Sequence, residues 1–215
     1  MRYTSVLFDL DGTLLDTLGD LTAAMNRTLT RHGLPERTRQ QMRAALGNGA
    51  RRLMELSVPA GTDSALFETL LAEYNADYAA HCRIETAPYP GVAALLLKLH
   101  AQGRKLAIVS NKPDEAVRAL RAEFFADAVP IAVGETAAIR RKPAPDMLLA
   151  AMEKLGADPD KTVFVGDSEV DIATARAANL PCISVLWGFR DRDVLERAGA
   201  QQFAADAGEL ARLLD

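Results

Sequence analysis

The stretch Val6-Leu7-Phe8-Asp9-Leu10-Asp11-Gly12-Thr13 places two closely spaced carboxylates directly after an apolar run. Side chains at i and i+2 of a strand point to the same side, so Asp9 and Asp11 share one face at the strand's C-terminal end. Such carboxylates repel each other unless a cation lies nearby, and the pair suits Mg²⁺ with nucleophilic and acid–base chemistry. The alternative is an ordinary Asp-Gly turn, in which Gly12 allows the bend and an Asp caps the next helix.

Short apolar runs alternate with helical patterns over most of the chain. The expected strands are residues 3–8, 105–109, 129–133, 162–165 and 182–186, with a short sixth at 202–203. Expected helices between them include residues 92–101, 115–123, 146–155 and 172–178. This alternation predicts an α/β fold with a Rossmann-like parallel sheet and helices on both faces. Ligands of such sheets bind at the C-terminal ends of the strands.

The segment that follows the first strand lacks strand patterns. Its apolar residues recur at helical spacing, as in Leu21, Ala24, Met25, Thr28 and Leu29 and in Leu66, Leu70, Tyr74 and Tyr78. Gly47-Asn48-Gly49 interrupts the helical pattern between these two groups. We therefore expect a small all-helical insert, residues 16–82, within a core made of residues 1–15 and 83–215.

The composition excludes several classes of protein. Of 215 residues, 49% are hydrophobic and 25% are charged, which is ordinary for a globular protein. The net charge of −4 does not indicate binding to a nucleic acid. No apolar run approaches the roughly 20 residues that span a bilayer. The chain runs straight from Met1 into a strand-like segment, so we expect no signal peptide and a cytoplasmic location.

Two further polar motifs follow strand-like or loop segments. Ser110-Asn111 ends an apolar strand, where a hydroxyl and a backbone N–H can donate to a phosphoryl oxygen; the alternative is a helix N-cap. Lys142 precedes Pro143, and the restricted backbone could hold its ammonium against a nucleophile and a phosphate. The alternative for Lys142 is a solvated lysine in a proline-rich loop.

Further acidic residues lie in the stretch Gly166-Asp167-Ser168-Glu169-Val170-Asp171, directly after the strand expected at 162–165. Asp167 should lie at the same sheet edge as Asp9 and Asp11, and Asp171 faces the same cleft if a helix starts there. Oxygen ligands of this kind suit Mg²⁺. The alternative is a set of acidic residues at a helix N-terminus, which explains Glu169 well and Asp167 poorly.

These motifs together resemble the haloacid-dehalogenase-like phosphatases, and within them most closely the phosphoglycolate phosphatases. The similar residues run through Asp9-x-Asp11-Gly12-Thr13, Ser110-Asn111, Lys142-Pro143 and Gly166-Asp167-Ser168-x-x-Asp171, with Gly47-Asn48-Gly49 in a helical cap. The resemblance implies a Mg²⁺-dependent enzyme, a monomer or homodimer, that removes phosphate from a small phosphorylated metabolite. It implies neither a nucleic acid nor a membrane as partner.

The resemblance also implies roles for individual residues. Asp9 is the expected nucleophile, Asp11 the general acid and base, and Lys142 the bridge between Asp9 and the phosphate. Magnesium would be held by Asp9, Asp167 and the main-chain carbonyl of Asp11, and Asp171 would orient either Lys142 or water ligands of the ion. Residues expected to hold the phosphoryl oxygens are Thr13, Ser110 and Asn111.

The helical cap is expected to select the substrate. We hypothesise that Asn48 and one of Arg51 or Arg52 contact the leaving group, because a guanidinium suits a carboxylate such as that of 2-phosphoglycolate. The alternative is an exposed helical arginine pair. Other activities also stay open: a sugar-phosphate phosphatase or phosphomutase, a dehalogenase that attacks carbon, or a non-enzymatic switch phosphorylated on Asp.

Overall fold

A computed structural model describes residues 2–215 and divides them into a core unit and a helical unit. The core unit contains the chain up to Asp16 together with Pro88–Asp215, and the helical unit is Thr17–Ala87. The helical unit is therefore an insertion in the sequence of the core unit, directly after its first strand. No helix within residues 2–215 combines the length and apolar character that a membrane span requires.

The core unit is built on a parallel sheet, whose strand order over residues 2–215 is β5-β4-β1-β6-β7-β8. The strands are β1 (Ser5–Phe8), β4 (Lys105–Pro113), β5 (Ile131–Glu135), β6 (Thr162–Gly166), β7 (Cys182–Val185) and β8 (Phe203–Ala204). The central place of β1 follows from its sequence, because Val6, Leu7 and Phe8 are fully buried. A parallel strand that is covered on both faces needs such a continuous apolar run.

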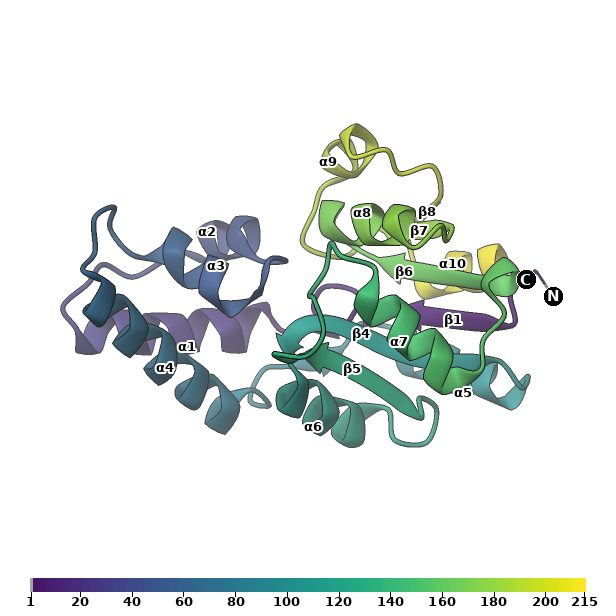
Figure 1. Cartoon of the computed structure of the whole chain (residues 1–215), viewed down its shortest axis with the longest axis horizontal. Coiled ribbons are helices and arrows are strands. Elements are labelled where there is room, and N and C mark those ends of the chain that lie inside the picture. The colour runs from purple at the N-terminus through teal and green to yellow at the C-terminus, as the bar shows by residue number, and fades with distance from the viewer. Residues whose placement is uncertain (1) are drawn as a thin grey trace. The chain divides into compact units, whose positions relative to one another are not determined.

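Helices cover both faces of this sheet. In Figure 1, α7 (Asp146–Leu155) lies in front of it and α5 (Val92–Ala101) lies behind it. Leu7 and Phe164 belong to one apolar cluster with Met147 and Leu148 of α7. The other elements of this unit are α6 (Asp114–Phe124), η1 (Pro159–Lys161), α8 (Glu169–Ala177), α9 (Arg192–Arg197) and α10 (Ala207–Leu214). The predicted α/β class, with its parallel sheet and helical insert, is confirmed.

The end of β4 differs from the sequence-based expectation. The strand continues past Val109 to Pro113, and the following helix α6 begins only at Asp114 with Pro113 before it. Ser110 and Asn111 are therefore strand residues at the C-terminal edge of the sheet. The alternative that either residue caps a helix is wrong.

The helical unit consists of α1 (Leu18–Arg31), α2 (Arg39–Ala45), α3 (Gly49–Ser57) and α4 (Ser64–His81). Helices α1 and α4 pack together, and most of the apolar positions that the sequence pattern picks out on them are buried. An ion pair joins the same helices, because Arg27 Nε of α1 donates to Asp77 Oδ2 of α4 at 2.8 Å. Asp77 is nearly inaccessible to solvent.

The helical unit extends beyond the insert boundary that the sequence suggests. The carboxylate of Asp20 in α1 accepts hydrogen bonds from the backbone N–H groups of Ile84, Glu85 and Thr86, at 3.1, 2.9 and 3.0 Å. These contacts hold residues after Cys82 against α1, and the unit ends at Ala87. Short strands β2 (Leu15–Asp16) and β3 (Ala87–Pro88) pair where the chain passes between the units.

Candidate active site

The ammonium of Lys142 joins two carboxylates at the C-terminal edge of the sheet. Its Nζ lies 2.7 Å from Asp9 Oδ1 and 2.7 Å from Asp171 Oδ1, and the Lys142 side chain is only 3% exposed. Asp9 follows β1 directly, and its backbone N–H donates to the carbonyl of Val165 in β6 at 2.9 Å. Residues from three distant parts of the sequence thus form one buried cluster.

The N-terminus of α8 fixes the position of Asp171. The Ser168 side chain accepts from the Asp171 backbone N–H, and the Asp171 carboxylate accepts in return from the Ser168 backbone, which is a capping box. Asp171 Oδ2 also accepts from the Ser168 hydroxyl at 2.6 Å. Because Oδ2 serves the helix cap, Oδ1 is presented to Lys142.

Asp167 is held by the loop that follows β7. Its Oδ2 accepts from the backbone N–H of Phe189 at 2.6 Å, and its Oδ1 lies 3.4 Å from the Thr13 hydroxyl. Two glycines make room for this carboxylate, since a Cβ at Gly12 or Gly188 would collide with Asp167. Gly12 also has φ of +86°, a backbone conformation that glycine adopts without strain.

Asp11 is paired with a different cation from Asp9. Lys112, in the last part of β4, places its Nζ 3.0 Å from Asp11 Oδ1. The Lys112 side chain is 5% exposed and that of Asp11 is 20% exposed. The two carboxylates after β1 therefore each lie against a lysine, and Asp11 is the more accessible of the two.

Asn111 connects β4 to the loop that carries Lys142. Its Nδ2 donates to the Lys142 carbonyl at 3.0 Å, and its Oδ1 accepts from the Lys142 N–H at 2.8 Å. These two hydrogen bonds set the backbone from which the Lys142 side chain extends. Ser110 is buried beside it, and its hydroxyl accepts from the Lys112 N–H at 3.3 Å.

Burial dominates the electrostatics of this cluster. Desolvation raises the pKa of Asp9 well above its usual value, although the ammonium of Lys142 opposes that shift. Burial, with the negative charge of Asp171, also raises the pKa of Asp167 to about 7. Burial disfavours the charged form of Lys142, but Asp171 and Asp9 outweigh it and raise the pKa of that lysine.

The same cluster has the composition of a site for a hard cation. Oxygen atoms of Asp9, Asp167 and Asp171 lie within 4.8 Å of one another. Burial raises the pKa of Asp9 and of Asp167, and a bound cation would favour the ionised forms of both carboxylates. Magnesium prefers oxygen ligands, so the residues fit it. Since Asp171 serves Ser168 and Lys142, Asp9 and Asp167 are the better candidate ligands.

The structure brings together the site residues that the sequence predicts for the core unit. They are Asp9, Asp11, Thr13, Ser110, Asn111, Lys142, Asp167 and Asp171. Sequence reasoning missed Lys112 and the Phe189 N–H group. Neither leaves a local signal in the sequence, because Lys112 lies in an irregular part of β4 and the N–H of Phe189 is a backbone donor.

The predicted cap residues lie in the helical unit and are engaged there. Arg51 donates to both carboxylate oxygens of Glu68 at 2.8 Å, and Arg52 donates to Glu55 at 2.8 Å. Asn48 precedes α3 as its N-cap, without a side-chain hydrogen bond to the helix. Both arginine side chains are about half exposed. Their pairing matches the alternative of exposed helical arginines.

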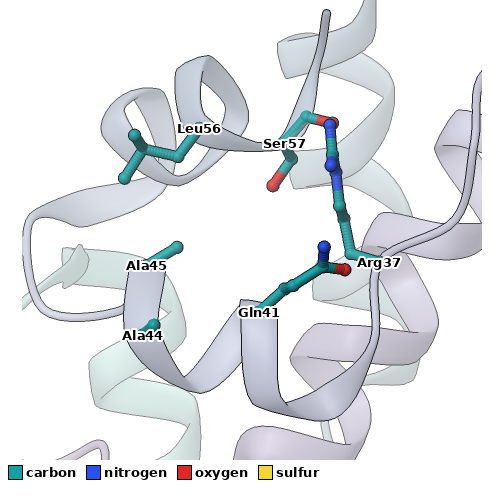
Figure 2. A pocket seen from close by; sticks show the side chains of 6 residues that line it. All are labelled: Arg37, Gln41, Ala44, Ala45, Leu56 and Ser57. Atoms are coloured by element: carbon teal, nitrogen blue, oxygen red, sulfur yellow. The ribbon is translucent and has the colours of Figure 1, made fainter.

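A shallow cavity of about 340 Å³ opens between α2 and α3 of the helical unit. Figure 2 shows the Arg37 side chain reaching toward Ser57, whose carbonyl accepts from Arg37 Nε at 2.7 Å. The cavity is lined by Arg37, Gln41, Ala44, Ala45, Leu56 and Ser57. No predicted site residue is among them.

Comparison of the sequence with known proteins shows which family the chain belongs to. The model of the haloacid dehalogenase-like hydrolases matches residues 6–185. A phosphoglycolate phosphatase of Xanthomonas campestris pv. campestris (strain 8004) is 35% identical over 192 residues, covering 88% of this chain and 86% of its own. An N-acetylmuramic acid 6-phosphate phosphatase of Pseudomonas aeruginosa is 33% identical over 217 residues, covering 100% of this chain and 96% of its own.

Solved structures agree with the sequence relatives. The crystal structure of a proposed phosphoglycolate phosphatase from Lactobacillus delbrueckii subsp. bulgaricus matches with a TM-score of 0.94 and 36% identity. That match covers 100% of this chain and 99% of the other.

Proposed function

This chain belongs to the haloacid dehalogenase-like hydrolases, and on that premise we propose that it hydrolyses a small phosphate monoester through a covalent intermediate on Asp9. The observation that carries the proposal is the buried contact of Asp9 with Lys142, beside the more accessible Asp11. A carboxylate that is held by a cation can attack phosphorus, and a second carboxylate nearby can transfer the proton.

In the first step, an Asp9 carboxylate oxygen attacks phosphorus and forms a new P–O bond. The bond between phosphorus and the ester oxygen of the substrate breaks, and protonated Asp11 delivers its proton to that leaving oxygen. Lys142 balances the negative charge that the phosphoryl group brings to Asp9. Phosphoryl transfer depends mainly on this kind of positioning and charge compensation.

In the second step, water attacks the phosphorus of the phosphorylated Asp9. Asp11, now ionised, removes a proton from the water, and the bond between phosphorus and Asp9 breaks to release inorganic phosphate. The Ser110 hydroxyl, the Thr13 hydroxyl and the backbone N–H of Asn111 are proposed to hold the phosphoryl oxygens in both steps. Asp171 acts through Lys142, whose Nζ it orients.

The cofactor of the proposed reaction is Mg²⁺. The carboxylates of Asp9 and Asp167 and the main-chain carbonyl of Asp11 are its proposed ligands. When bound, the ion neutralises negative charge on the phosphoryl oxygens and on the carboxylates. The Phe189 N–H group and the two glycines around Asp167 support the binding of an ion, because they fix that carboxylate in one orientation.

The proposed substrate is 2-phosphoglycolate, with glycolate and phosphate as products. Support comes from the relatives that carry the name phosphoglycolate phosphatase at 35% identity. A sugar phosphate is the second candidate, because the Pseudomonas relative that acts on N-acetylmuramic acid 6-phosphate covers this chain completely. The helical unit is proposed to act as a cap that selects between leaving groups, and Asn48 with Arg51 or Arg52 are its candidate contacts.

Phosphate release from a substrate panel tests the proposal. The panel contains 2-phosphoglycolate, N-acetylmuramic acid 6-phosphate, glucose 1- and 6-phosphates and a nucleoside monophosphate, each with Mg²⁺ and with EDTA. We expect hydrolysis that depends on Mg²⁺ and favours 2-phosphoglycolate. Preference for a sugar phosphate would keep the mechanism and replace the substrate. Absence of phosphate release from every ester would contradict a phosphatase and favour a phosphomutase, a dehalogenase or a phospho-Asp switch.

A further inference from the structure

The contact between Lys112 and Asp11 is the part of the site that the proposed chemistry leaves unexplained. Resting on the proposed function, we propose that Lys112 is a specificity-determining residue that binds an anionic group on the leaving group of the substrate. The ligand class is a phosphomonoester whose carboxylate lies one carbon from the ester oxygen. The recognising cation would then be part of the core unit.

The position of Lys112 follows from the extension of β4 to Pro113. Lys112 lies two positions after Ser110, where the pairing of β4 with β5 is irregular, and its backbone N–H donates to the Ser110 hydroxyl at 3.3 Å. Ser110 is proposed to hold the phosphoryl group, and Lys112 reaches Asp11 at 3.0 Å. The Lys112 side chain is 5% exposed, so its charge lies inside the site and is poorly screened by water.

Asp11 marks where the leaving group must lie. A general acid protonates an oxygen that is within hydrogen-bond distance of it. The Lys112 Nζ is 3.0 Å from the same carboxylate, so substituents close to the leaving oxygen come within reach of the ammonium. In 2-phosphoglycolate the carboxylate is attached to the carbon that bears the ester oxygen, which places a negative charge near this cation.

One lysine can serve two carboxylates in this site. Lys142 shows the arrangement, since its Nζ contacts Asp9 and Asp171 at 2.7 Å each. An ammonium has three N–H donors. Lys112 can therefore contact Asp11 and a substrate carboxylate at the same time, as Lys142 does with its two partners.

The arginines of the helical unit are the competing explanation. Arg51 already donates to both oxygens of Glu68, and Arg52 donates to Glu55. Either guanidinium would have to exchange a protein carboxylate for the substrate, on a surface where water screens the interaction. The Lys112 ammonium is buried beside Asp11, so its charge acts on the leaving group with little screening by water.

The test compares 2-phosphoglycolate with its neutral amide, 2-phosphoglycolamide, which differs only at the carboxylate. We expect the wild type to favour the acid in kcat/KM by about tenfold to a hundredfold, as for one charge-assisted contact. In Lys112→Met the ratio of the two kcat/KM values should fall to near one. The ratio cancels any effect on Asp11 that both substrates share.

Matched variants control this experiment. Lys98→Met removes the same charge from an exposed site on α5 and should keep the wild-type ratio. Lys112→Arg keeps the charge and should restore part of the preference, even if Lys112→Met folds poorly. The proposal is overturned if Lys112→Met keeps the wild-type ratio, if the wild type shows no preference for the acid, or if only Arg51→Ala and Arg52→Ala remove it.

Binding without turnover separates this inference from the proposed function. Calorimetry on Asp9→Asn and on the double variant with Lys112→Met measures the affinity for the acid and for the amide. Loss of the acid preference in the double variant supports the role of Lys112 even if the wild type hydrolyses neither compound. An unchanged preference overturns it even if hydrolysis is fast.

Discussion

The core unit and the helical unit use ion pairs in opposite ways. In the core, Lys142 and its two carboxylates are almost completely buried, and the Lys142 Nζ contacts both at 2.7 Å. In the helical unit, Arg51 and Glu68 form a pair of good geometry that is about half exposed. A buried charge that loses its partner is strongly destabilising, whereas an exposed pair contributes little. The comparison indicates that burial fixes the charges of the candidate active site, whereas the charges of the helical unit can exchange partners with solvent.

The largest effect on activity is expected when the proposed nucleophile Asp9 is changed. Asp9→Asn should lower phosphate release by at least about a thousandfold, because an amide is a poor nucleophile. The amide oxygen can still accept from Lys142, so circular dichroism and thermal unfolding should match the wild type closely. Turnover near the wild-type rate would show that Asp9 does not carry the phosphoryl group.

Removal of the shared cation should have the next largest effect. Lys142→Met leaves Asp9 and Asp171 buried without their counter-ion, and we expect the free energy of unfolding to fall by about 3–5 kcal/mol. Urea unfolding in EDTA measures this loss, with Lys98→Met as the control for an exposed lysine. Equal stability of the two variants would mean that the buried cluster resembles the exposed pairs after all.

Crowding of Asp167 tests whether its fixed orientation matters for the cation. Gly188→Ala places a Cβ against Asp167 and should weaken Mg²⁺ binding by about tenfold to a hundredfold. Isothermal titration calorimetry gives the affinity, and Gly208→Ala in the exposed start of α10 is the control. An affinity equal to that of the control would exclude Asp167 as a ligand.

The raised pKa of Asp167 predicts how stability depends on pH without metal. The folded protein keeps this proton up to about pH 7, whereas the unfolded chain loses it near 3.8. Between these values the folded state binds more protons, so the contribution of Asp167 to the free energy of unfolding falls as pH rises. Thermal unfolding in EDTA should show a slope that is reduced in Asp167→Asn. Added Mg²⁺ should oppose the slope, because it stabilises the ionised form.

The smallest effect is expected in the helical unit. Arg51→Ala removes an exposed pair with Glu68, and the melting temperature should stay within experimental error of the wild type. Differential scanning calorimetry of Arg51→Ala and Glu68→Ala checks this. If Arg51→Ala lost as much stability as Lys142→Met, the exposed pairs of the helical unit would not differ from the buried pairs of the core unit.

Particular residues show how far sequence reasoning reaches. The apolar runs before Asp9 and Asp167 predicted two strands that end at the same edge of one sheet. The structure makes these strands neighbours, with Phe8 paired with Val165. Lys142 was predicted to act at the same edge, and it contacts Asp9. Lys112 was missed because the strand was expected to end at Val109, which left the residues after it without a defined direction. The hydrogen bonds of Asp20 to residues 84–86 were missed for another reason, because contacts across 64 or more residues leave no local pattern in the sequence.

The sequence by itself determined the α/β class, the helical insert and the family, because strand and helix periodicity and the order of the polar motifs are local properties of the chain. Only the tertiary structure decided which carboxylate lies against which lysine, that Lys142 contacts two of them, and how deeply these side chains are buried. Those properties depend on distances between residues such as Asp9 and Lys142, and on the exclusion of water from between them. Distance and desolvation arise only when the sheet and its helices are assembled, and they set the chemistry of the site.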